Sequence, residues 1–342
     1  MGNLKILRSL VCWAYVWLAC TAVSLPVDAD GAQVSQSINT TLLTGDENIP
    51  SDFKLLLTIY DSDINVISFY LNSIDAIIVL SQRSCYSSTD GYHLFDLPPY
   101  MSFQASTTIY PHLINCHIIW ATQRLVSIFF GSGGSGQYKE AAGQMRILQQ
   151  KRAAVVGTFS LRQSNGVVDS LSSGGTSSKN ETIVARQTAL ESRQTGSDGT
   201  GAIDSPGVDS GFGFDVEWIE GAKTLGSIKV FVSVVRALAR IAVEDAAASC
   251  SAFDYEDSET EVYIGMREQS PSAGRVFYGD VSISLQKLVI AMIDKKRFAE
   301  VQVTLFKMNP RRVNYGIVTI LKSRAGTTIQ SVDNDDGLGT AW

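Results

Sequence analysis

Side chains suited to acid–base catalysis or metal binding are few in this chain. Its three histidines, His93, His112 and His117, all lie in the first half of the sequence. His112 and His117 are five positions apart, so they do not share one helix face as an i, i+4 metal-binding pair would. Cys116 and His117 are neighbours, and adjacent side chains on a helix point about 100° apart, which argues against a Cys–His catalytic dyad. We therefore expect no bound metal and no cofactor.

Other patterns that suggest chemistry have the wrong context. Residues 131–136 match the glycine spacing of a dinucleotide-binding loop, but they follow a predicted helix instead of opening one, so we interpret them as a helix stop. No Gly-x-Ser-x-Gly motif marks a nucleophile at a strand-to-helix turn. A hydrolase would have to use His93 with a carboxylate such as Asp90.

One acidic run could in principle bind calcium. It comprises Asp254, Glu256, Asp257, Glu259 and Glu261. The run lacks the central glycine and the fixed ligand spacing of a calcium loop. We therefore predict a solvated acidic loop.

A pair of basic residues recurs in two similar contexts. Lys151 and Arg152 occupy one predicted hairpin, and Arg311 and Arg312 occupy another. Charge at a hairpin discourages edge-to-edge pairing of sheets, and this is the interpretation that we favour. The alternative is a pair of contacts for a sulfated or phosphorylated partner or an acidic lipid.

These candidates belong to a larger repetition that must position them. Residues 53–161 and 214–321 show the same order of patterns at an offset of roughly 160 positions, which predicts a duplicated domain. In each copy a strand leads to an apolar helix that ends at a Ser-Cys pair. A short strand, a second apolar helix and a closing hairpin follow. Each copy is therefore predicted as β-α-β-α-β-β.

This order predicts an α+β fold, in which each copy forms a two-layer α/β sandwich with its helices on one face of a small sheet. The first helix of each copy, at residues 64–82 and 228–245, is apolar around most of its circumference. Such a helix needs a partner beyond its own sheet. We expect the two lobes to pack against each other through these helices with pseudo-twofold symmetry. The alternative is that each helix buries a single face.

The N-terminus has the anatomy of a secretory signal peptide. Lys5 and Arg8 precede an apolar run that continues to about residue 23. Cleavage after Ala22 or Ala29 fits the small-residue rule. The run is shorter than the roughly 20 residues of a membrane span, so we expect no span after signal removal, and an uncleaved anchor is the alternative.

Composition shifts divide the remaining chain. The predicted segments are a signal peptide at 1–22 (or to 29), disordered tails at 30–50 and 324–342, lobes at 51–162 and 212–323, and a flexible Ser/Gly-rich linker at 163–211. Glycosylation sequons begin at Asn39 and Asn180, outside both lobes, where a glycan would not disturb a core.

Three cysteines remain once the signal is removed, namely Cys85, Cys116 and Cys250. An odd number allows at most one disulfide within the chain. A Cys85–Cys116 bridge would join consecutive helices of the first lobe, whereas a Cys85–Cys250 bridge would join the lobes at equivalent positions. The third alternative is three reduced, buried thiols.

These features favour a secreted, extracellular, glycosylated protein without enzymatic activity. Its layout resembles that of many secreted binding or effector proteins of eukaryotic microbes, which implies a role in virulence, a protein or glycan partner outside the cell, and a monomer with an internal pseudo-dimer. The net charge of −6 disfavours nucleic-acid binding. The alternative is a secreted hydrolase whose asymmetric site lies between the lobes and uses His93. A third class is a small-molecule carrier.

Overall fold

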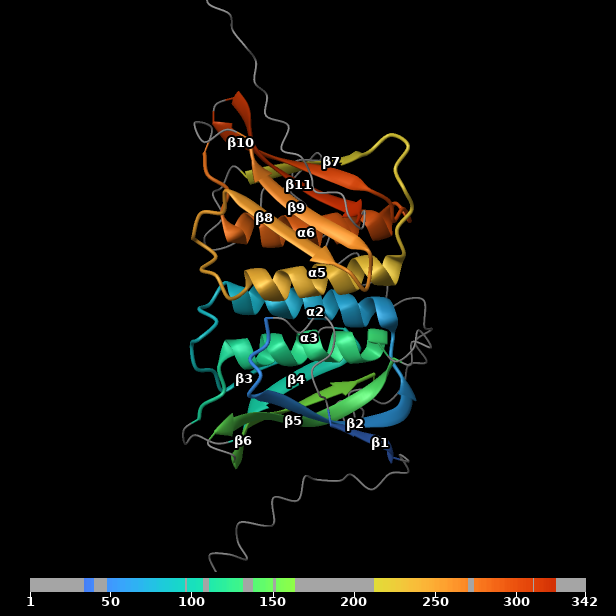
Figure 1. The fold of residues 1–342 in the computed structure, drawn as a ribbon, viewed down its shortest axis with the longest axis vertical. Coiled ribbons are helices and arrows are strands. Elements are labelled where there is room, and N and C mark those ends of the chain that lie inside the picture. Colours follow the sequence, from blue (N-terminus) through green and yellow to red (C-terminus); the bar gives the residue numbers. More distant parts are fainter. Residues whose placement is uncertain are drawn as a thin grey trace, which may run out of the picture. The chain divides into compact units, whose positions relative to one another are not determined.

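The protein folds into two α+β lobes, each with two helices on one face of an antiparallel sheet (Figure 1). The computed structural model describes residues 34–39, 48–95, 97–106, 111–131, 138–149, 152–163, 212–269, 274–309 and 311–323. The predicted signal peptide, most of both tails and nearly all of the predicted linker therefore lie outside the described residues. Within those ranges, no helix is long and apolar enough to cross a membrane.

The first lobe is built on a six-stranded sheet in the order β1-β2-β5-β6-β4-β3. Its elements are β1 (Val34–Asn39), β2 (Phe53–Asp63), α2 (Val66–Ser81), β3 (Gly91–Leu94), β4 (Tyr100–Ala105), α3 (Asn115–Gly131), β5 (Lys139–Gln149) and β6 (Arg152–Arg162). The pairings among β2, β5, β6, β4 and β3 are all antiparallel.

The second lobe has a five-stranded antiparallel sheet in the order β7-β10-β11-β9-β8. Its elements are β7 (Phe212–Trp218), α5 (Ser227–Ile241), β8 (Ala252–Asp257), β9 (Val262–Glu268), α6 (Tyr278–Asp294), β10 (Val301–Asn309) and β11 (Arg311–Lys322). From β2 and from β7 onward, the two lobes have the same order of elements along the chain and the same strand order in the sheet.

The order β-α-β-α-β-β predicted from the sequence is wrong in two respects. The first sheet has an edge strand, β1, that was not predicted. Each lobe also has an additional strand after its first helix, namely β3 and β8. The first is only four residues long. In β8 the apolar residues Phe253 and Tyr255 alternate with exposed acidic residues, and those charges suggested a loop. Alternation with period two indicates a half-buried strand even when its exposed positions are charged.

Local signals account for the positions of the other elements. In β2, alternate residues Phe53, Leu55 and Leu57 are buried, as expected for a strand with one face on the core. The side chain of Asn65 accepts a hydrogen bond from the Ser68 amide at 2.9 Å and caps α2. The carboxylate of Asp280 likewise accepts a hydrogen bond at 3.1 Å from a backbone amide at the start of α6.

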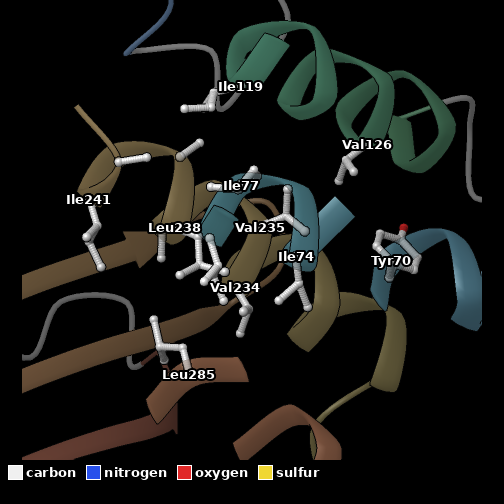
Figure 2. Close-up of a cluster of buried hydrophobic side chains, with 14 of the residues drawn as sticks. Tyr70, Ile74, Ile77, Ile119, Val126, Val234, Val235, Leu238, Ile241 and Leu285 are labelled. Carbon is white, nitrogen blue, oxygen red and sulfur yellow. The ribbon is translucent and has the colours of Figure 1, made fainter. Parts of the chain in front are cut away.

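The lobes share one apolar core in which α5 contacts both α2 and α3. Tyr70 of α2 stacks on Phe231 of α5, with 5.3 Å between ring centroids and 9° between ring planes. Figure 2 shows side chains of this core from both lobes, among them Ile74, Val126 and Val234. These contacts agree with the predicted packing of the lobes through apolar helices.

A buried ion cluster lies beside this apolar contact. Arg236 of α5 is 1% exposed and donates to Asp257 at 2.9 Å, to Glu259 at 2.8 Å and to the hydroxyl of Ser127 on α3 at 3.2 Å. Burial opposes the charge of Arg236, but the two carboxylates raise its pKa above the ordinary value. The prediction of a solvated loop is therefore wrong for Asp257, which is buried.

Candidate functional site

The candidate site is a pocket of about 530 Å³ in the first lobe, near the first residue of α3. Segments from four parts of the chain line it: the residues before β2, the loop after α2, the start of α3, and β5. The side chains on which the following argument rests are Asp52, Tyr86, His112, His117, Trp120 and Ile147.

The local fold holds two walls of this pocket together. The loop after α2 lies against the start of α3, where the Cys116 amide donates to the Cys85 carbonyl at 2.7 Å and the Asn115 amide donates to Ser87 at 3.1 Å. A disulfide joins Cys85 to Cys116 at the same place. Tyr86 and His117 directly follow these two cysteines in the sequence, and both line the pocket. The pocket walls are thus linked covalently and by backbone hydrogen bonds.

His117 forms part of the pocket interior. It is 6% exposed and stacks on Phe53, with 5.9 Å between ring centroids. Burial lowers the pKa of His117 to about 4, although the carboxylate of Asp52 opposes this shift. Its Nδ1 accepts a hydrogen bond from the Ile114 amide at 3.3 Å. The neutral ring therefore carries its proton on Nε2.

Trp120 lies one helical turn further along α3. It is 6% exposed, and its indole packs edge-on against Phe53, with 5.5 Å between centroids. Within the described part of the chain, the indole Nε1 is buried and has no hydrogen-bond acceptor. A buried donor without an acceptor is uncommon in folded proteins and calls for an explanation.

The outer part of the pocket is more accessible. The side chain of Tyr86 is 67% exposed, which is unusual for a large aromatic residue, and Asp52 is also exposed. The pocket therefore combines an exposed aromatic ring and a carboxylate at its rim with an imidazole and an indole in its interior. In the described ranges, His, Cys, Asp and Glu side chains do not gather in any group of three or more that could hold a metal ion.

The residues nominated for a hydrolase lie elsewhere. The His93 Nδ1 forms a hydrogen bond with the Ser102 hydroxyl at 2.8 Å, and its ring stacks on Phe95. Ser102 alternates along β4 with the buried residues Met101 and Phe103, so His93 lies on the sheet face opposite the helices. Asp90 is exposed just before β3. The contact between the lobes is instead made by helices.

The basic residues of the two hairpins are only partly described. Lys151 lies outside the described residues, and Arg152 begins β6. Arg311 and Arg312 begin β11, and both are exposed. Arg312 forms an ion pair with Asp215 and lies over the Phe306 ring at 4.1 Å. A carboxylate of the protein itself thus already offsets the charge of Arg312.

The three cysteines adopt the first of the predicted arrangements. Cys85 and Cys116 are bonded, and Cys250 is a buried thiol whose pKa burial raises to about 11. A bridge between Cys85 and Cys250 is therefore not formed. Of the two sequon asparagines, Asn39 is the last residue of β1, and Asn180 lies outside the described residues.

Sequence reasoning missed the pocket because its polar residues are not close together in the chain. Asp52, Tyr86 and Trp120 were not singled out, and His112 and His117 were considered only as a metal pair or, for His117, as a catalytic partner of Cys116. One available signal was that Tyr86 and His117 each follow a cysteine. If those two cysteines pair, the neighbouring residues must also be close in space.

Comparisons with known proteins assign no family. No protein-family model matches the chain, and no curated protein matches it. One solved structure found in the search is a conserved hypothetical protein from Mycobacterium tuberculosis with a double hotdog fold. It is 8% identical over 73% of this chain and 80% of that chain, with a TM-score of 0.10. A likeness at that level carries no argument about fold or function.

Proposed function

We propose that this protein is a secreted, glycosylated binding protein of the effector type, without enzymatic activity, that acts outside the cell. The predicted signal peptide and the two sequons motivate this proposal. The Cys85–Cys116 disulfide supports it, because disulfides persist mainly in oxidising compartments.

The observation that carries a binding role is the pocket beside the disulfide. Its walls are joined by the Cys85–Cys116 bond and by backbone hydrogen bonds, so its shape does not have to form when a ligand arrives. A preformed site loses less conformational entropy on binding than a flexible one. Its volume of about 530 Å³ falls within the range of small-molecule sites, roughly 300–1,000 Å³.

The shared core gives this pocket a rigid support. Helix α3, which contributes His117 and Trp120 to the pocket, also contacts α5 of the second lobe. Ser127 of α3 accepts a hydrogen bond from the buried Arg236. We infer that the second lobe serves mainly to hold the first lobe in position.

The two lobes are also proposed to be copies of one ancestral unit related by a pseudo-twofold axis. The shared order of elements and the shared strand order support this proposal. Superposition of the equivalent strands of one lobe on those of the other tests it. Failure of the equivalent strands to superpose would contradict the duplication.

The alternative of a hydrolase with His93 between the lobes is less well supported. His93 lies on the outer face of its sheet, and buried apolar side chains of α2 and α5 fill the contact between the lobes. A broad hydrolase screen is still required, because turnover of any substrate would contradict a purely binding function.

Expression of the full chain in a eukaryotic secretory host tests the proposal. We expect processed protein in the medium that carries a glycan, one disulfide and one free thiol by intact mass. We also expect saturable binding to cell surfaces or isolated cell-wall material. Retention of an unprocessed chain in the cell, or absence of binding to any extracellular material, would contradict the proposed function.

A further inference from the structure

We propose that the pocket beside α3 binds a neutral sugar unit of an extracellular glycan. This inference rests on the proposed binding function and adds the chemical class of the ligand. It is argued from the polar groups of the pocket, from its apolar surfaces and from its charge.

The polar groups of the pocket include both hydrogen-bond donors and acceptors. The carboxylate of Asp52 accepts hydrogen bonds only, whereas the hydroxyls of Tyr86 and Ser88 can donate and accept. The neutral ring of His117 accepts from the Ile114 amide through Nδ1 and carries a donor on Nε2. Sugar hydroxyls also donate and accept, so they can satisfy such a mixed set of partners.

The buried indole of Trp120 contributes apolar surface. The side chain lines the pocket and is 6% exposed, while its Nε1 has essentially no accessible surface and no acceptor within the described residues. A ligand in the pocket therefore meets carbon atoms of the indole and not its N–H group.

The apolar surfaces of the pocket suit the C–H faces of a sugar ring. The ring of Tyr86 is 67% exposed at the rim, and Ile114 and Ile147 also line the pocket. Aromatic rings provide a large apolar surface at a low cost in conformational entropy, and they are common at ligand sites that have one wet side. The backbone at Tyr86 adjoins the disulfide-bonded Cys85, so the position from which this ring extends is fixed before the ligand binds.

The charge of the pocket argues against an anionic ligand. Among the described lining residues there is no lysine or arginine, and Asp52 is a carboxylate. Recognition of sulfate or phosphate generally uses arginine or lysine. A cationic ligand would be attracted by Asp52, but it would leave the Nε2 donor of His117 without an acceptor. A neutral hydroxylated ligand satisfies both kinds of group.

The test measures binding of defined sugars to the secreted, full-length protein. The probes are methyl glycosides of glucose, galactose and mannose, and short oligomers of N-acetylglucosamine, measured by saturation-transfer NMR and calorimetry. Tetramethylammonium and a sulfated oligosaccharide are the comparison probes. We expect at least one neutral sugar to bind, and both comparison probes to bind more weakly.

Two variants locate the binding in the pocket. Tyr86→Ala and Asp52→Asn should each weaken binding of that sugar by about tenfold, because the first removes the aromatic surface and the second replaces a charged hydrogen-bond acceptor with a weaker neutral one. The matched controls are Phe95→Ala, which removes another exposed aromatic ring of the same lobe, and Asp90→Asn, which neutralises another exposed carboxylate. Both controls should bind as the wild type does. All four positions are exposed, so the variants should fold.

Three results would overturn the inference: no neutral sugar binds, tetramethylammonium or the sulfated probe binds more tightly, or Tyr86→Ala and Asp52→Asn retain wild-type affinity. If the protein still binds cell surfaces in a protease-sensitive manner, the sugar inference fails and the proposed binding function stands. If surface binding is also absent, both fail.

Discussion

Arg236 brings a full positive charge into the contact between the lobes. It is 1% exposed, and Asp257 and Glu259 bind its guanidinium. A buried ion pair adds little net stability, because removing both charges from water is costly. Loss of one partner is different, since the remaining charge is then buried without compensation. Burial also disfavours the charged form of the pocket residue His117, and there it lowers the pKa.

We expect Arg236→Ala to lower the free energy of unfolding by about 3–5 kcal/mol, because it leaves Asp257 buried without its cation. Arg240→Ala, on the same helix but at an exposed position, is the control and should cost about 1 kcal/mol or less. Urea-induced unfolding measures both variants. Equal losses would mean that the buried pair contributes no more than a surface contact.

The pH dependence of stability should report on His117. Burial lowers its pKa from the ordinary 6.5 to about 4 in the folded protein. Between these values the unfolded chain binds more protons than the folded protein. The free energy of unfolding should therefore fall as pH decreases from about 6.5 to about 4, by up to ~3 kcal/mol from this residue.

Unfolding midpoints at a series of pH values measure this effect. The variant His117→Gln should be less sensitive to pH in that window, because its side chain does not titrate. The variant His93→Gln, at an exposed position, should retain the wild-type slope. If His117→Gln keeps the wild-type slope, another group is responsible.

At the scale of secondary-structure elements, the link between α2 and α3 defines the pocket. The loop after α2 and the residues before α3 are joined by backbone hydrogen bonds, by the isolated bridge between Ser88 and Ile114, and by the Cys85–Cys116 disulfide. The corresponding cysteine of the second lobe, Cys250, remains a buried thiol. The disulfide and the pocket beside it thus both lie in the first lobe.

Replacing both Cys85 and Cys116 with alanine should lower the free energy of unfolding by about 3–4 kcal/mol. The bridge closes a loop with a sequence separation of 31, and loss of such a constraint makes the unfolded chain more favourable. Cys250→Ala is the control and should have a smaller effect. Thermal unfolding with and without reductant measures the difference, which should disappear under reducing conditions. If the variant and the wild type still differ in stability in the presence of reductant, the loss comes from side-chain packing and not from the disulfide bond.

At the scale of the whole molecule, the two lobes share one buried core and should unfold together. Tyr70 and Phe231 stack across the contact, and α5 is buried against helices of the first lobe. Because the lobes share this core, unfolding of one exposes apolar surface of the other, so we expect a single cooperative transition. Because α5 is buried against helices of both lobes, neither lobe has a complete core without the other.

The variant Phe231→Ala tests this coupling. It should lower the free energy of unfolding by about 3–5 kcal/mol, as expected when a buried aromatic side chain is truncated. Trp120 reports on the first lobe and Trp218 on the second, so single-tryptophan variants allow each lobe to be followed by fluorescence. We expect both signals to shift together, although Phe231 belongs to the second lobe. A Trp120 transition that is unaffected by Phe231→Ala would contradict the coupling.

The sequence was sufficient to predict the helices, most of the strands and the α+β class. Apolar periodicity in β2 and in the helices shows which face of each element is buried. This pattern can be recognised from residues that are close together in the chain. The same reasoning missed β8, because its charged residues occupy the exposed positions of an alternating strand. It also left the pairing of Cys85, Cys116 and Cys250 open.

Only the tertiary structure decided which distant residues meet. Arg236 binds Asp257 at the end of β8, Glu259 in the turn that follows, and Ser127 from a helix of the other lobe, at a sequence separation of 109 for Ser127. The pocket likewise brings Asp52 and Tyr86 next to His117. A local pattern reports the environment of a residue but does not identify its partner, because partners are selected by how the complete chain packs.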